Sequence, residues 1–153
     1  MTRPVRWTRL GSVVLALAVL VAACGGDDGG SSRGPDGELT VVGAFLPEPP
    51  LDIAALYLTL DNRTHTDDVL VGASTPVADD ATVHGPGMAT TEGGLPLPAG
   101  KQTTLEPGGA HVMLTGVTGV QEGDTVGVTL DFAVHPPITV EVPVTRIGST
   151  EAP

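Results

Sequence analysis

The chain has 153 residues, of which 18 are acidic and 7 are Lys or Arg, so its formal charge at pH 7 is −11. This balance disfavours a nucleic-acid partner, because such binding requires a basic patch. The chain has one Cys, which excludes an intrachain disulfide.

The first 23 residues have the pattern of a targeting segment. Three arginines precede an apolar run at 11–23 (GSVVLALAVLVAA), which is short for a permanent membrane-spanning helix. Small residues then precede Cys24, which resembles the lipobox of bacterial lipoproteins. We therefore predict a lipoprotein signal peptide at 1–23 and lipidation of Cys24. The alternatives are an ordinary signal peptide with a chance Cys and an uncleaved anchor, and all three place the domain outside the cytoplasm.

Residues 24–37 follow as a predicted flexible tether. Gly, Ser and Asp predominate after the Cys, and nothing there is apolar enough to offset the entropy cost of ordering. Loss of residues 1–23 would remove three basic residues and no acidic ones, which leaves four basic against 18 acidic residues and a formal charge of −14.

Residues 38–147 are predicted to form one all-β domain, with a C-terminal tail at 148–153. Short β-branched runs alternate with Gly, Pro, Asn and Asp, and no helical period is present, as is typical of an all-β sandwich. The expected strands are 39–45, 54–61, 69–74, 81–84, 103–105, 110–115, 125–134 and 138–145. The last two should form a hairpin around His135-Pro136-Pro137.

Both methionines that would remain after processing lie close to a histidine. Met88 follows His84 by four positions, and His111 and Met113 are separated by one residue. In a strand, this last spacing puts the imidazole and the thioether on the same face. Such a ligand set suits Cu(I) better than Zn, Mg or Ca. The alternative is that Met113 fills a gap in the core beside a surface histidine.

The same residues carry a family resemblance that covers about 40–147. The order His84, Met88, His111, Met113 resembles that of the PCuAC-type periplasmic copper chaperones, as do the segments AALYLTLDN (54–62) and EGGLPLPAG (92–100). That family usually has a Met directly after the first His and a longer loop, whereas this chain has Gly85 and three residues before Met88.

The resemblance implies a cupredoxin-like Greek-key β-sandwich and a copper(I) chaperone with these four ligands. It also implies a recipient such as a haem-copper oxidase, so that the protein would act in cytochrome oxidase assembly, together with a thioredoxin-like assembly factor. The competing hypotheses are a β-sandwich interaction or adhesion lipoprotein without metal, and a copper scavenging or storage protein.

Other functional classes find little support. His65 and His135 lie in predicted turns without a nearby Met, and we expect them to be solvent-exposed. No G-x-S-x-G, H-E-x-x-H or phosphate-binding loop is present, which argues against an enzyme. A blue-copper electron carrier needs a Cys thiolate, and Cys24 is assigned to lipid.

Overall fold

The computed structural model describes residues 37–89 and 91–153. The predicted signal peptide, Cys24 and all but the last residue of the tether lie outside the described residues. The strands are β1 Leu39–Pro47, β2 Ile53–Asn62, β3 Asp68–Ser74, β4 Asp80–His84, β5 Leu95–Leu97, β6 Lys101–Leu105, β7 His111–Thr115, β8 Thr125–Phe132 and β9 Ile138–Thr145. One 3-10 turn, η1 at Pro86–Met88, follows β4. No helix in the described part is long and apolar enough to span a membrane.

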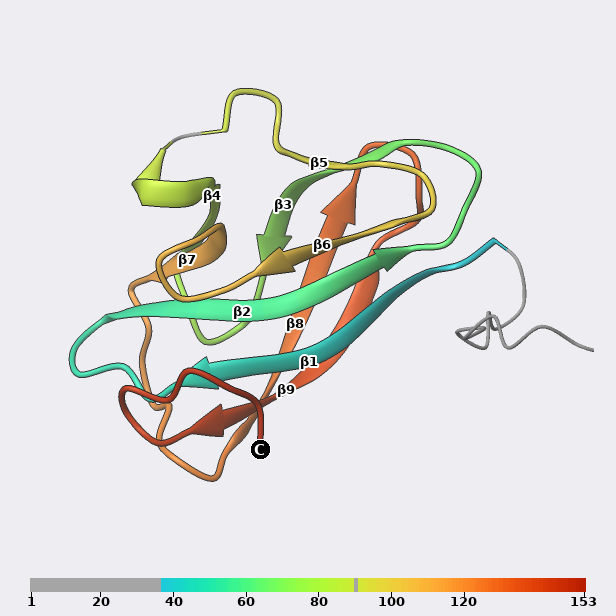
Figure 1. Cartoon of the computed structure of the whole chain (residues 1–153). Helices are drawn as coiled ribbons and strands as arrows, with labels where there is room; N and C mark the ends of the chain where they lie inside the picture. The colour runs from blue at the N-terminus through green and yellow to red at the C-terminus, as the bar shows by residue number, and fades with distance from the viewer. Residues whose placement is uncertain (1–36, 90) are drawn as a thin grey trace, which may run out of the picture. The chain divides into compact units, whose positions relative to one another are not determined.

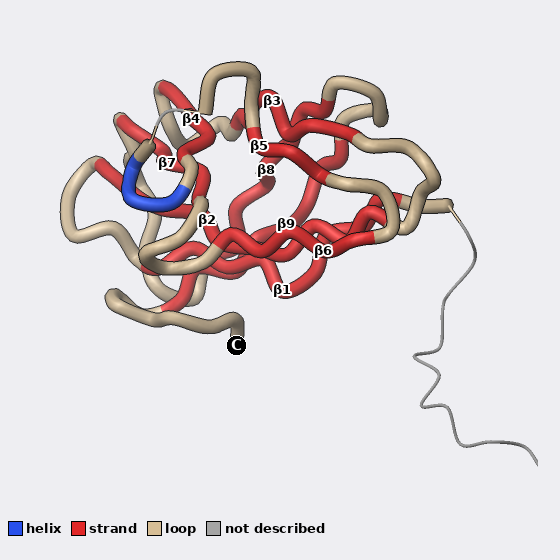
Figure 2. Tube along the Cα trace, turned by 45° about the horizontal axis from the view of Figure 1, so that its top comes forward, coloured by secondary structure: helices blue, strands red, loops and turns tan. Residues whose placement is uncertain are grey.

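The strands form one continuous sheet, which curves round so that its two halves pack as layers joined through β1. One layer has the order β4, β7, β2, β1, with β6 also paired to β2, and the other has the order β9, β8, β3, β5. In Figure 1, β1, β2 and β6 lie in front of β3 and β8, and Figure 2 shows the strands arranged around a common interior. The predicted all-β, cupredoxin-like Greek-key sandwich is confirmed.

Strand β1 takes part in both layers. It is antiparallel to β2 from Leu39 onward and parallel to β9 at Leu46 and Pro47. A register shift lies between Val42 and Phe45, where Gly43 has a φ of +61°. Such a bulge bends a strand and increases its twist, and here it lets one strand pass from one layer to the other.

Two strands share the remaining edge of β2. β7 pairs with Ile53 to Leu56, and β6 pairs with Leu58 to Asn62. Between β6 and β7 the chain leaves the sheet as a loop at 106–110, closed by a hydrogen bond from Glu106 N to the Ala110 carbonyl (2.9 Å). This loop therefore ends immediately before His111, the first residue of β7.

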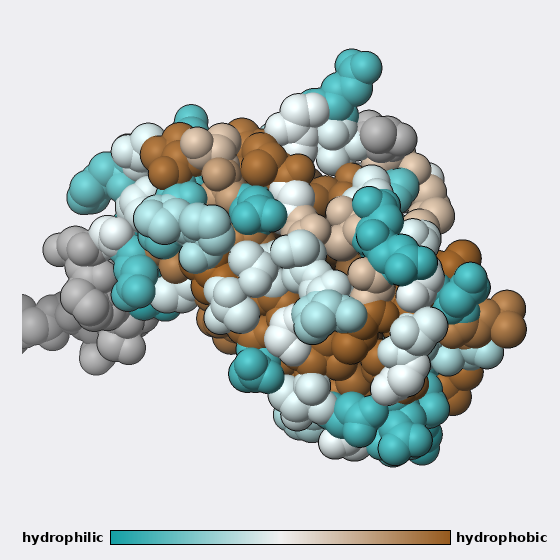
Figure 3. All heavy atoms as spheres, turned by 180° about the vertical axis from the view of Figure 1, so that it is seen from behind, coloured by the Kyte–Doolittle hydropathy of each residue, from teal (hydrophilic) through white to brown (hydrophobic). Residues whose placement is uncertain are grey.

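The core lies between the layers and is formed by alternate residues of the strands. Fully buried members include Leu46, Leu56, Leu58, Leu60, Leu70, Leu97, Leu105, Leu114, Leu130, Val112, Val128 and Val142. Each such side chain stabilises the fold by about 1.5–3 kcal/mol relative to an exposed one. The predicted hairpin of β8 and β9 is present, with Val142 and Val144 buried and Val140 half-buried. Figure 3 shows apolar atoms between hydrophilic ones on the face opposite to the view of Figure 1.

The structure differs from the expected strands in one added strand, β5, and in several strand ends, since β6 begins at Lys101 and β8 ends at Phe132. β5 was not predicted, because it has three residues with Pro in the middle. β1 continues to Pro47, which the sequence analysis placed outside the strand. A proline is tolerated here because the pairing of β1 with β2 ends at Phe45, and the next backbone N–H, that of Glu48, donates to the Thr145 carbonyl (2.8 Å).

Candidate metal site

His84 and His111 face each other across neighbouring strands. In the antiparallel pair of β4 and β7 they are direct register partners. Their rings are stacked, with centroids 5.4 Å apart and planes inclined by 15°. His111 is buried and His84 is half-buried. The structure thus brings together two histidines that are 27 positions apart in the sequence.

Met113 lies on the same face of β7 as His111. The intervening Val112 and the following Leu114 point into the core and have no exposed surface, whereas Met113 is half-buried. Its cross-strand partners are Ala55 on β2 and Thr82 on β4, both small. Met113 is thus a half-buried thioether with small lateral neighbours, on the face of β7 away from the core.

Met88 lies on the short loop that follows β4. Its side chain is 56 % exposed, and η1, which contains it, lies beside β4 and β7 in Figures 1 and 2. The loop closes on itself through a hydrogen bond from Gly85 N to the Ala89 carbonyl (2.8 Å). Met88 has a φ of +65°, a conformation that is uncommon for a residue with a side chain. Such strain often accompanies a functional position.

Two aromatic residues that the sequence analysis missed extend the row of histidines across the sheet. Tyr57 on β2 lies 6.4 Å from His111 between ring centroids, and Phe45 on β1 lies 5.3 Å from Tyr57. Burial raises the pKa of the Tyr57 hydroxyl. The signal that could have identified Tyr57 is its place in the alternation of β2, on the same face as Ala55. Together the rings cover His111 on the side away from His84.

The ring nitrogens of the two histidines differ in their contacts. Nδ1 of His111 lies 3.2 Å from the carbonyl oxygen of Gly109. Nδ1 of His84 is buried and has no hydrogen-bond partner among the described residues. An unsatisfied buried polar atom is rare and calls for a partner or a ligand. The ring nitrogens of His84 and His111, with the thioether of Met113 on the same face, therefore fit a metal ion at this position.

The chemistry of the site depends on sulfur. Among residues 37–89 and 91–153, no group of three or more His, Cys, Asp and Glu side chains is placed to hold a metal ion. Beside His84 and His111, Met113 offers a thioether on the same face, which is a soft ligand. This composition favours Cu(I) over ions that prefer oxygen or thiolate.

The other two histidines lie elsewhere. His65 is exposed, as expected, in the loop after β2. His135 is half-buried rather than exposed, because its ring packs edge-on against Phe132 (6.1 Å) and its Nδ1 lies 2.9 Å from the Pro136 carbonyl oxygen. Neither is near a methionine in the sequence.

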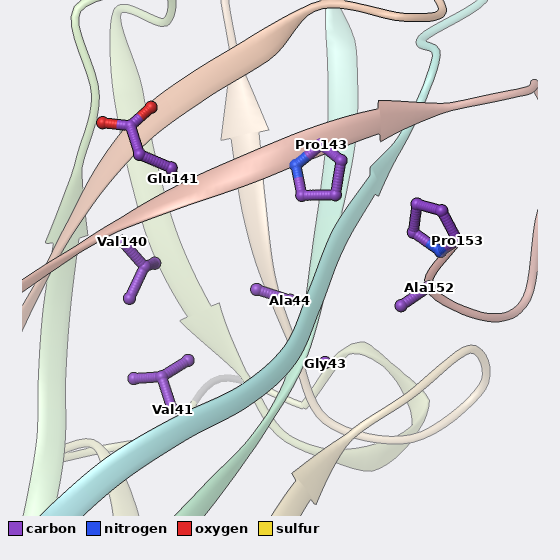
Figure 4. A pocket seen from close by; sticks show the side chains of 8 residues that line it. All are labelled: Val41, Gly43, Ala44, Val140, Glu141, Pro143, Ala152 and Pro153. Carbon is purple, nitrogen blue, oxygen red and sulfur yellow. The ribbon is translucent and has the colours of Figure 1, made fainter.

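A pocket of about 470 Å³ lies away from the histidines (Figure 4). It lies where β1 and β9 diverge, and the C-terminal residues approach it. Its lining is Val41, Gly43, Ala44, Val140, Glu141, Pro143, Ala152 and Pro153. With one charged side chain and no imidazole or sulfur, this lining offers no soft metal ligand.

A protein-family model describing LpqE-like lipoproteins matches residues 39–144. The chain belongs to the LpqE-like lipoprotein family. A relative from Leifsonia xyli subsp. xyli (strain CTCB07), Lxx21020, also carries the lipoprotein designation in its name. It is 27 % identical over 154 residues, covering 94 % of this chain and 90 % of the relative.

Solved structures with the same fold include copper-bound domains. The copper-bound PCuAC domain from PmoF2 has a TM-score of 0.65 at 23 % identity, over 74 % of this chain and 97 % of that domain. The solution structure of CuI-DR1885 from Deinococcus radiodurans has a TM-score of 0.57 at 29 % identity, over 77 % of this chain and 83 % of the other. The predicted resemblance to the PCuAC-type family is confirmed.

Proposed function

We propose that this protein is a lipid-anchored, extracytoplasmic copper(I) chaperone whose cargo ion is bound by His84, Met88, His111 and Met113. The observation that carries the proposal is the cross-strand pair of His84 and His111, with the Met113 thioether on the same face. The fold adds support, because a similar chain at 29 % identity, DR1885, has been solved with CuI.

The position of the ligands suits a carrier rather than an enzyme. Met88 is exposed, so a second protein can approach one of the four donors directly, and His84 beside it is half-buried. Transfer by ligand exchange requires such access. By resemblance, the recipient is the copper centre of a haem-copper oxidase, with a thioredoxin-like factor assisting.

The proposed extracytoplasmic location is supported by the N-terminal sequence and by the name of the family. Residues 1–23 are proposed to be removed as a signal peptide, and Cys24 to carry the lipid. Residues 24–37 would then hold the domain at 38–147 away from the membrane, with 148–153 as a tail. The lipoprotein names of the family and of the Leifsonia relative support this arrangement.

The test is Cu(I) titration against a competing chelator, under anaerobic conditions, of the parent protein and Met113→Leu. This substitution nearly conserves volume and apolarity and usually costs less than about 1.5 kcal/mol of stability. We expect one tight site in the parent and a large loss of affinity in the variant, with little change in the denaturant midpoint. Equal affinity of the two proteins would refute the proposed site.

A further inference from the structure

The contact between His111 and Gly109 determines which nitrogen of His111 is free. A carbonyl oxygen only accepts hydrogen bonds, so the 3.2 Å contact requires a proton on Nδ1 of His111. A neutral imidazole carries one proton, which leaves the lone pair on Nε2. The loop at 106–110 thus sets the tautomer of the first residue of β7.

His84 has the opposite arrangement. Its Nδ1 is the buried nitrogen without a partner among the described residues, while the side chain as a whole is half-exposed. A buried polar atom left unpaired destabilises the fold. A proton on the other nitrogen, Nε2, would leave a lone pair on Nδ1, where a metal ion can satisfy it.

We infer that the two histidines bind the ion through different atoms, His111 through Nε2 and His84 through Nδ1, with Gly109 as a positioning residue. This inference rests on the proposed copper function and specifies its donor atoms. The two rings also differ in how firmly their neighbours hold them in place. His111 is held by the Gly109 carbonyl and lies between the rings of His84 and Tyr57, whereas β4, which carries His84, is the last strand of its layer.

The first experiment is nitrogen NMR of the ¹⁵N-histidine-labelled protein at pH 8. Spectra of the metal-free protein report the tautomer of each ring. Ag(I), a d¹⁰ ion like Cu(I) with a spin-½ nucleus, is then added, and the coupling of silver to nitrogen identifies the bound atom. We expect a protonated Nδ1 on metal-free His111, and coupling to Nε2 of His111 and Nδ1 of His84.

The outcomes separate this inference from the copper function. If Cu(I) binds tightly but silver couples to Nε2 of both rings, the copper function stands and the donor assignment is wrong. If neither Cu(I) nor Ag(I) binds, both are wrong. A protonated Nε2 on metal-free His111 would by itself overturn the role of Gly109.

A variant of the loop tests the positioning role. In Gly109→Ala the new Cβ would lie 2.9 Å from Glu106 Cγ and 3.3 Å from the Glu106 carbonyl oxygen, so the Glu106 side chain must move and the loop backbone must give by a few tenths of an ångström. Loss of a group that orients a metal ligand typically costs about 10–100-fold in affinity. We expect a loss of about tenfold, together with a mixed tautomer of His111. A mixed tautomer at unchanged affinity would overturn the positioning role.

The matched control is Gly127→Ala on β8, where the Cβ would meet one atom, Glu141 Oε1, at 3.6 Å. We expect this variant to retain both the tautomer and the affinity of the parent. Should Gly109→Ala fail to fold, the spectra of the parent protein still decide the donor atoms.

Discussion

Tyr57 lies between Phe45 and His111 in a row of rings that crosses four neighbouring strands. The Tyr57 ring packs on one side of the His111 ring, and the His84 ring packs on the other side. A side chain in this position limits the rotation of His111 without contributing a ligand. Its role can therefore be separated from that of the four proposed ligands.

We predict that Tyr57→Leu lowers Cu(I) affinity by about two- to tenfold, because an aromatic pair contributes about 0.5–1.5 kcal/mol beyond its buried area. Tyr57→Phe, which keeps the ring, should bind as the parent does. The measurement is chelator competition on all three proteins. A loss in the Phe variant equal to that in the Leu variant would assign the effect to the hydroxyl instead.

At the scale of elements, Asp68 connects the start of β3 to the turn between β8 and β9. Its carboxylate, which is 7 % exposed, accepts backbone N–H groups from Val69 (2.7 Å), Val134 (2.9 Å) and His135 (2.9 Å). Burial alone raises the pKa of Asp68, but these three donors and the nearby His135 more than offset it. The net pKa is below the usual 3.8.

We predict that Asp68→Asn destabilises the protein by about 1–3 kcal/mol at pH 7, the cost of unpairing buried groups. Because the folded-state pKa lies below the unfolded one, the contribution is full above about pH 4 and is lost as the pH falls through the folded value. Urea midpoints at pH 7 and pH 3 should therefore differ less in the variant than in the parent. The control is Asp67→Asn, an exposed neighbour that accepts one backbone N–H, from Ala99 (2.8 Å); it should change the midpoint much less. Equal losses in the two variants would contradict the assigned role of Asp68.

The short strand β5 depends on a close approach of Gly94 to β3. A Cβ at Gly94 would collide with the Leu70 carbonyl oxygen and lie 2.7 Å from Val69 Cγ1, and its φ is +101°. At Gly93, φ is +83° but a Cβ would meet nothing within 4 Å.

We predict that Gly94→Ala lowers the free energy of unfolding by clearly more than Gly93→Ala. Both variants bear the cost of a positive φ, which is of order 1–3 kcal/mol, and only the first adds the collision with β3. Thermal unfolding of the two variants and the parent gives the comparison. Equal losses would show that β5 can move away from β3 at little cost.

How far the sequence predicts this structure depends on the range of the interactions involved. The alternation of β2 and β7 follows from local pattern, and so does the face shared by His111 and Met113. The register of β4 on β7, which sets His84 opposite His111, depends on pairing between distant segments and cannot be read from local pattern. The same holds for β5, whose strand conformation comes from its contact with β3. The Gly109 contact is invisible in sequence because it involves a backbone carbonyl.

At the scale of the whole molecule, the proposed anchor and the acidic charge have opposite effects on membrane association. A mature chain with a formal charge of −14 would be repelled by an anionic membrane surface, so its retention there depends on lipid. The charge also draws cations weakly towards the domain.

We predict that Cys24→Ser transfers the protein from the membrane fraction to the soluble fraction or leaves an unprocessed precursor. Fractionation followed by immunoblotting distinguishes these results. A Cys24→Ser chain of mature size that stays with the membrane would disprove lipidation of Cys24. A high-salt wash of the parent membranes is the control, because retention after the wash excludes electrostatic binding as the reason for membrane association.

The exposure of Met88 makes the domain sensitive to oxidants. A thioether that is 56 % exposed should be converted to the sulfoxide before the half-buried Met113. The sulfoxide binds through a harder oxygen atom, which Cu(I) accepts poorly. Peptide mass spectrometry after mild peroxide treatment should therefore detect oxygen first on Met88, and the affinity for Cu(I) should fall in the same step. Methionine sulfoxide reductase would reverse the change, so that the proposed binding of Cu(I) would depend on repair.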